Sequence, residues 1–219
     1  MEKSDRRYES SETYWKRKAS LFSNLYETWN PLLVPARLFL KHRQERVQKY
    51  LPRSSEGKAA DIGCGSGEFA SMLAARFREV VGLDYSEMML ELAKKRISNP
   101  KITFTQADCR KLPLADRSID FLSALGLLDY VKTPDEAVLE FARVMKKGAK
   151  GVLTFPKSPS LFAPLRISQT FRGVLFKIPP IVNVFSEPKV RSLVEKSGFK
   201  ILEISALWTT MWIIHVERR

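Results

Sequence analysis

Residues Ala59–Gly67 read AADIGCGSG and carry the strongest structural signal in the sequence. Asp61 ends a short run of small and apolar residues, and glycines then occupy positions 63, 65 and 67. A side chain at these positions would keep the backbone away from a ligand at the carboxyl end of a strand, where the following helix presents free N–H groups. A tight turn between a strand and a helix needs only one or two glycines. Three at alternate positions therefore predict a ligand-binding turn.

On either side of this turn, short β-type runs alternate with amphipathic helical stretches. The expected strands are Ala59–Ile62, Val80–Asp84, Ile102–Ala107, Ile119–Ala124 and Gly151–Phe155. The expected helices between them are Glu68–Phe77, Ser86–Ser98 and Pro134–Met145. Such alternation is typical of a parallel sheet that is covered by helices.

The carboxyl-terminal part of the chain departs from this alternation. A helix is expected at Lys189–Ser197, and two strands follow it at Lys200–Ala206 and Trp212–Glu217. Two strands so close in sequence cannot be joined by a helical crossover, so they must pair antiparallel. The sequence therefore predicts a doubly wound α/β fold, whose seven-stranded and mostly parallel sheet ends in an antiparallel last strand.

Two regions fall outside this predicted core. Residues 1–53 are expected to form a helical amino-terminal cap or substrate lid, and residues 54–219 the core, with a substrate-side insert at about 156–188. A connection as long as this insert is usually functional or disordered, and its apolar content favours function. The aromatic residues expected to line an acceptor pocket are Tyr14, Trp15, Phe22, Tyr26, Trp29, Phe155, Phe162, Phe171 and Phe176. The basic residues that would favour an acidic acceptor are Arg166, Arg172 and Lys177.

Composition limits the class of protein. The chain has 219 residues, of which 44% are hydrophobic, and this is enough for one buried α/β core. No apolar run approaches the roughly 20 residues that cross a bilayer, and the amino-terminal segment lacks the apolar core of a secretory signal. Two cysteines are too few for a disulfide framework. These features predict a cytoplasmic protein without a transmembrane segment.

The formal net charge of +13 favours acidic partners such as nucleic acid, an anionic membrane surface or a carboxylated small molecule. Lysine and arginine are mixed with acidic residues, as in KHRQERVQK at 41–49, and form no single basic block with interleaved aromatics. A generally basic surface is therefore favoured over a dedicated polyanion site. Nucleic acid and peripheral membrane contact stay open, and the oligomeric state is not predicted.

The spacing of the glycines distinguishes between two kinds of nucleotide. A dinucleotide fingerprint would place its third glycine or alanine at position 68, where this chain has Glu68. The GxGxG form after Asp61 resembles motif I of class I S-adenosylmethionine-dependent methyltransferases, and the similarity extends from about Lys58 to the carboxyl terminus. The resemblance implies an enzyme that uses S-adenosylmethionine, releases S-adenosylhomocysteine and needs no metal. It also implies that the loop Gly63, Cys64, Gly65 and Gly67 wraps around the methionine part of the cofactor and that Asp61 orients its amino group.

Asp84 ends the second expected strand, where a carboxylate can accept both hydroxyl groups of a ribose. The alternative role of Asp84 is to cap the next helix, but Ser86 already fills that position. The ribose role is therefore favoured, and Tyr85 and Met88 are expected near the cofactor.

The third and fourth strands complete the predicted cofactor site. Asp108 follows the third strand between Ala107 and Cys109, and the resemblance implies that its carboxylate accepts a hydrogen bond from the adenine amino group. Turns favour aspartate for local reasons as well. After the fourth strand, the resemblance places Leu125 and Gly126 close to the transferred methyl group.

No residue stands out as a catalytic base. Methyl transfer from a sulfonium needs mainly an acceptor in line with the methyl group, and a base is optional. Asp129, Tyr130 and Tyr26 are the candidates for proton transfer, whereas His42 and His215 are expected to be structural or exposed. The acceptor is expected to be a small acidic or amphiphilic aromatic or aliphatic molecule, methylated on oxygen, nitrogen or carbon.

Three alternatives remain. A nucleic-acid methyltransferase fits the charge but lacks an NPPY-like tetrad after the fourth strand, where Leu125–Leu128 reads LGLL. A cofactor-binding protein without catalysis is a second alternative, although the intact glycine motif argues against it. A nicotinamide-dependent oxidoreductase is disfavoured by the glycine spacing.

Overall fold

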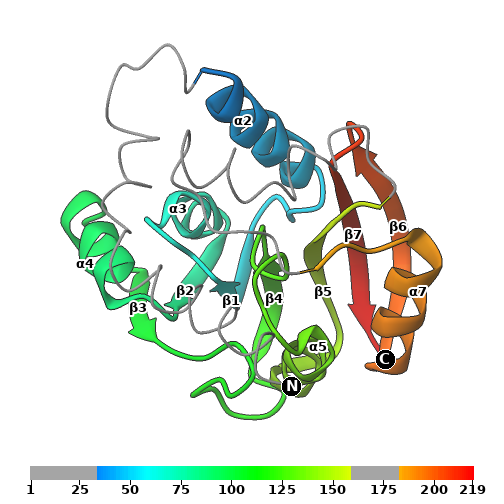
Figure 1. Ribbon diagram of the computed structural model, residues 1–219. Helices are drawn as coiled ribbons and strands as arrows, with labels where there is room; N and C mark the ends of the chain where they lie inside the picture. Colours follow the sequence, from blue (N-terminus) through cyan, green and yellow to red (C-terminus); the bar gives the residue numbers. More distant parts are fainter. Residues whose placement is uncertain (1–33, 159–182) are drawn as a thin grey trace, which may run out of the picture.

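The computed structural model describes residues 34–158 and 183–219, which fold around one seven-stranded sheet (Figure 1). The strands are β1 Ser55–Ile62, β2 Phe77–Asp84, β3 Ile102–Gln106, β4 Ile119–Ala124, β5 Met145–Pro156, β6 Phe199–Leu207 and β7 Met211–Arg218. The helices in these ranges are α2 Val34–Gln48, α3 Glu68–Ala74, α4 Glu87–Arg96, α5 Pro134–Val144 and α7 Glu187–Lys196. No helix within them is both long and apolar enough to span a membrane.

The strand order is β3-β2-β1-β4-β5-β7-β6. Neighbouring strands from β3 to β5 pair parallel, whereas β7 pairs antiparallel with both β5 and β6. The predicted mostly parallel sheet with an antiparallel last strand is confirmed. The strand order reverses direction between β1 and β4, and ligands of open α/β sheets bind at the carboxyl ends of the strands beside such a switch point.

Apolar side chains are buried on both faces of the sheet because successive residues of a strand point to opposite sides. In β4, Phe121 belongs to the core under α2, α3 and α4, while Leu122 belongs to the core that includes α5 and α7. On the first face, Val47 of α2 and Leu73 of α3 are fully buried. On the second face, Phe141 of α5 is fully buried. Helices thus cover both faces, as a doubly wound fold requires.

Several predicted boundaries were wrong by a few residues. The first core helix ends at Ala74 and not at Phe77, because Arg76 N–H already bonds to the Leu73 carbonyl and the Phe77 ring packs 5.5 Å from that of Phe121 at the start of β2. The third strand ends at Gln106, one residue before the predicted end. Several strands also begin earlier than predicted; β5, for example, begins at Met145. Exposed polar residues near the start of these strands hide the strand pattern in the sequence.

The predicted amino-terminal cap is described only from residue 34 onward, where α2 is one of its expected helices. Residues 159–182 of the predicted insert lie outside the described residues. The candidates Tyr14, Trp15, Phe22, Tyr26, Trp29, Phe162, Arg166, Phe171, Arg172 and Lys177 all lie outside them. Phe155 is described and is part of the core, with its ring edge-on to Phe185 at 5.2 Å between centroids. The division into a cap, a core and an insert therefore stays a prediction.

Candidate cofactor site

The glycine loop lies between β1 and α3, as predicted. Gly63, Gly65 and Gly67 have φ angles of 70°, 54° and 85°, in the left-handed region that favours glycine. A Cβ atom on Gly67 would lie 2.6 Å from the Ile97 Cδ1 atom and 2.9 Å from the Phe104 Cζ atom. The conformation and the crowding together explain why position 67 carries no side chain.

The Asp84 carboxylate fixes this loop against the next strand. Its Oδ2 atom accepts the N–H of Gly65 at 2.8 Å, and its Oδ1 atom accepts the N–H of Ser86 at 2.9 Å. Burial raises the pKa of Asp84, and these two N–H donors act in the opposite direction. Because each carboxylate oxygen can accept more than one hydrogen bond, Asp84 retains acceptor capacity for the hydroxyl groups of a ligand.

Asp61 is the most deeply buried acid of the site, with only 2% of its surface exposed. Its Oδ1 atom accepts the hydroxyl of Ser123 at 2.7 Å, but its buried Oδ2 atom has no hydrogen-bond partner. Burial raises the pKa of Asp61 to about 7, while the Ser123 hydroxyl and the positive charge of Arg43 act to lower it. A buried polar atom without a partner is uncommon and costly. This geometry fits a cationic donor brought by a ligand.

Arg43 is a site residue that the sequence did not reveal. It projects from α2, and its Nη1 atom donates to the Leu125 carbonyl at 3.4 Å. A Cβ atom on Gly126 would lie 2.8 Å from the same Nη1 atom. The Arg43 Nε atom is buried and has no acceptor. Since the charge of Arg43 also lowers the pKa of Asp61, the two side chains belong to the same site at the carboxyl ends of β1 and β4, and each has one unpartnered buried atom.

A spacing signal could have identified Arg43. Arg43 and the fully buried Val47 are four residues apart on α2, and residues four apart lie on the same helix face. An arginine on the buried face of a charged helix needs a partner. That face is hard to recognise in the sequence because basic residues occur throughout the stretch 41–49.

Asp108 lies beyond β3, and its carboxylate is already paired. The Arg110 Nη2 atom donates to its Oδ2 atom at 2.6 Å, and the Arg110 N–H donates to its Oδ1 atom at 2.9 Å. The Arg110 side chain is the main reason why the pKa of Asp108 is lowered. The side chain is 32% exposed. An adenine amino group would therefore share this carboxylate with Arg110.

The loops after the strands are tied to one another. Ala107 N–H donates to the Asp84 carbonyl at 3.0 Å, and Gln106 Nε2 donates to the Tyr85 carbonyl at 3.0 Å. Gly126 N–H donates to the Thr154 hydroxyl at 2.7 Å. The structure thus brings the predicted residues after β1, β2, β3 and β4 to the same edge of the sheet. These comprise Asp61, Gly63, Cys64, Gly65, Gly67, Asp84, Tyr85, Met88, Ala107, Asp108, Cys109, Leu125 and Gly126.

The candidates for proton transfer lie partly within the described residues. Asp129 is buried and Tyr130 partly buried in the segment after β4, and the Asp129 carbonyl accepts the N–H of Asn183 at 3.3 Å. His42 lies on α2 with its ring stacked on Trp208, 5.9 Å between centroids. His215 lies in β7, on the face that also buries Ile213. No cluster of three metal-ligating side chains occurs in residues 34–158 and 183–219.

Comparison with known proteins agrees with this site. Residues 60–153 match a family model described as a methyltransferase domain. The magnesium protoporphyrin IX methyltransferase of Synechocystis PCC 6803, solved with bound S-adenosylhomocysteine, has a similar fold with a TM-score of 0.76 and 18% identity. The likeness covers 95% of this chain and 98% of that one.

Curated relatives are similar over part of their length. The 2-phytyl-1,4-naphtoquinone methyltransferase of Nostoc punctiforme is 36% identical over 135 residues, which cover 56% of this chain and 59% of the relative. The demethylmenaquinone methyltransferase of Renibacterium salmoninarum is 33% identical over 126 residues, covering 58% and 52%. The chain thus spans about half the length of these relatives. Residues 60–153 thus match a methyltransferase domain, and the fold is similar to that of a methyltransferase solved with bound S-adenosylhomocysteine, in line with the predicted family.

We expect Asp61→Asn to change how the stability of the ligand-free protein depends on pH. Because the pKa of Asp61 rises from 3.8 to about 7 on folding, the unfolded chain gives up this proton more readily. The fold therefore loses stability as the pH rises from about 4 to about 7. Between pH 5 and pH 8 the loss should be about 2 to 3 kcal/mol in the wild type relative to the asparagine variant. Urea unfolding of both proteins at the two pH values measures it, and parallel pH profiles would contradict the burial of this carboxyl group.

Proposed function

We propose that this protein transfers the methyl group of S-adenosylmethionine to an oxygen, nitrogen or carbon atom of a small acidic or amphiphilic acceptor. The observation that carries the proposal is the pair of unpartnered buried atoms, Asp61 Oδ2 and Arg43 Nε, beside the glycine loop. Folding leaves one oxygen of an acid and one nitrogen of an arginine without partners where a class I methyltransferase domain binds its cofactor. A ligand that carries both charges would satisfy both groups.

The amino-acid end of S-adenosylmethionine is such a ligand, since it has an ammonium and a carboxylate group. In the proposal, Asp61 accepts hydrogen bonds from the ammonium group, and Arg43 donates to the carboxylate. The glycine loop with Cys64 packs beside the methionine chain. Charge-assisted hydrogen bonds of this kind are about twice as strong as neutral ones.

The remaining cofactor residues lie at or beyond the carboxyl ends of β2, β3 and β4. Asp84 accepts the ribose hydroxyl groups while it still holds the Gly65 N–H, so the same carboxylate shapes the loop and binds the ligand. Asp108 and the neighbouring Ala107 and Cys109 lie beside the adenine. The cofactor residues on the remaining elements are Tyr85, Met88, Leu125 and Gly126.

Methyl transfer requires few catalytic groups from the protein. When bound, S-adenosylmethionine supplies an electrophilic methyl group: the acceptor's lone pair forms the new bond, and the carbon–sulfur electron pair stays on sulfur. The protein's role is to orient the acceptor and to exclude water from the site. Where the acceptor atom carries a proton, Asp129 after β4 is proposed to receive it, either directly or through the Tyr130 hydroxyl.

The acceptor class is supported by the relatives and by the chain's charge. Both quinone methyltransferases above are named for amphiphilic ring substrates. The net charge of +13 fits an acceptor with a carboxylate or other anionic group. The proposed location is the cytoplasm, which fits the two free thiols of Cys64 and Cys109.

We expect Arg43→Gln to weaken binding of S-adenosylhomocysteine about 10- to 100-fold, because it removes a charge-assisted hydrogen bond to the ligand carboxylate. Binding of 5′-methylthioadenosine should be unchanged, since this compound has the adenosine but lacks the amino-acid end. Asp84→Ala should weaken both ligands. Calorimetric titration measures all three proteins, and Arg46→Gln on the same helix is the matched control. Equal losses for both ligands in Arg43→Gln would contradict the assigned contact.

Activity requires a separate test. With radiolabelled S-adenosylmethionine, the wild-type protein should label at least one of a set of carboxylated aromatics, quinols and fatty acids, and Asp84→Ala should label none. RNA belongs in the same screen because the chain is basic. Labelling of RNA alone would contradict the small-molecule acceptor. Binding of cofactor with no labelling of any acceptor would favour a non-catalytic protein.

A further inference from the structure

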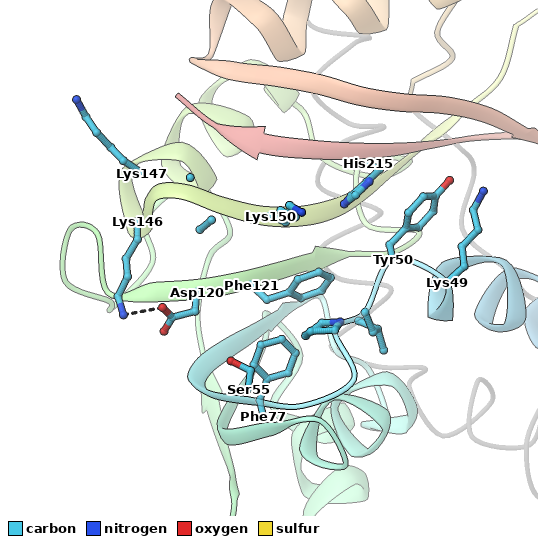
Figure 2. Close-up of a pocket in the computed structure, with 14 residues that line it drawn as sticks. Lys49, Tyr50, Ser55, Phe77, Asp120, Phe121, Lys146, Lys147, Lys150 and His215 are labelled. Carbon is cyan, nitrogen blue, oxygen red and sulfur yellow. Dashed lines mark hydrogen bonds and ion pairs between the residues drawn. The ribbon is translucent and has the colours of Figure 1, made fainter.

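A second cavity lies at the opposite edge of the sheet, where β1, β2, β4 and β5 begin (Figure 2). Its volume is about 580 Å³. Its lining includes the partly exposed turn Leu51–Pro52 and Tyr50, whereas the rings of Phe77 and Phe121, 5.5 Å apart, are each only 2% exposed. None of the predicted cofactor residues lines this cavity. An occupant here would therefore be distinct from both the cofactor and the methyl acceptor.

Four lysines surround the cavity, and two of them are neutralised. Lys49 pairs with Glu203 at 2.6 Å, and Lys146 pairs with Asp120 at 2.7 Å, as Figure 2 shows for the second pair. Lys147 and Lys150 are exposed and have no carboxylate within 4.0 Å in the part of the chain that the structure describes. Their two positive charges therefore remain available to a ligand.

His215 supplies an independent sign that a ligand is missing. Its Nε2 atom is buried but has no hydrogen-bond partner, and its ring lies 4.5 Å from the Tyr50 ring. Burial lowers the pKa of His215, and the charges of Lys150 and Lys49 lower it further. Glu203 on β6 and Glu217 on β7 act in the opposite direction. The imidazole is thus held neutral mainly by burial, and charges of both signs lie around it.

We propose that this cavity binds a small molecule with a phosphate group on an apolar body. A phosphate monoester carries a charge of about −1.5 to −2 at pH 7, which matches Lys147 and Lys150. One phosphate oxygen would partner the His215 Nε2 atom. The partly exposed turn Leu51–Pro52 suits an apolar body, and ligand pockets typically measure about 300 to 1,000 Å³.

The charges of the cavity favour a compact anion over an extended polyanion. Glu203 and Asp120 neutralise two of the lysines, so only Lys147 and Lys150 are left for phosphate groups, too few for a nucleic-acid backbone. Because this site lies away from the glycine loop, its ligand would not take part in methyl transfer. The inference does not depend on the proposed methyl transfer.

The test uses the two histidines of the chain, His42 and His215, as probes in one NMR experiment. We expect phenyl phosphate to raise the pKa of His215 by on the order of one unit, because it adds negative charge beside the imidazole. The ring resonances of His42 should not respond to the ligand. Inorganic phosphate should give the same shift at higher concentration, and phenol should give none.

Two double variants distinguish binding at this cavity from a general effect of the protein's positive charge. The double variant Lys147→Gln/Lys150→Gln should lose at least nine-tenths of the binding of phenyl phosphate, while the matched control Lys94→Gln/Lys95→Gln, on the exposed face of α4, should bind as the wild type does. All four lysines are exposed, so the fold should be retained, which circular dichroism verifies. An unchanged His215 pKa with millimolar phenyl phosphate, or equal binding by the two double variants, would overturn the proposal. So would a His215 response to a short RNA and not to phenyl phosphate.

Discussion

The Asp84 carboxylate connects the parts on which the cofactor site depends. By accepting the N–H groups of Gly65 and Ser86, it joins the loop after β1 to the start of α4. Buried backbone donors need such partners, and a single carboxylate here supplies two of them. The loop can then hold its left-handed glycines and leave its outer surface open to a ligand. Cofactor binding and local folding are therefore linked through one side chain.

Asp61 and Arg43 represent the opposite situation, because folding leaves both incompletely satisfied. The Ser123 hydroxyl satisfies one oxygen of Asp61, and the Leu125 carbonyl engages one nitrogen of Arg43. The Asp61 Oδ2 atom and the Arg43 Nε atom have no partner. Such strain in the free protein is expected at functional sites, where the ligand completes the hydrogen bonding. The two unpartnered atoms, one on an acid and one on an arginine, match the ammonium and carboxylate groups of a zwitterion.

Sequence reasoning recovered what depends on local chemistry and missed what depends on packing. Gly67 and Asp84 were predictable because a turn that admits a ligand and a carboxylate at a strand end have local signatures. Arg43 was not, since only the docking of α2 on the sheet brings it to Leu125. The end of α3 at Ala74 was missed for a similar reason: the burial of Phe77 in β2 overrides its fit to the helical pattern.

Proton release on cofactor binding tests the central claim most directly. At pH 6 the free protein holds a proton on Asp61, whose pKa is about 7, while the ammonium group of S-adenosylhomocysteine is already charged. Pairing with that ammonium group should ionise Asp61, so calorimetry in buffers of different ionisation enthalpy should show release of about one proton. Asp61→Asn should release none. Binding by the wild type without proton release would contradict the account.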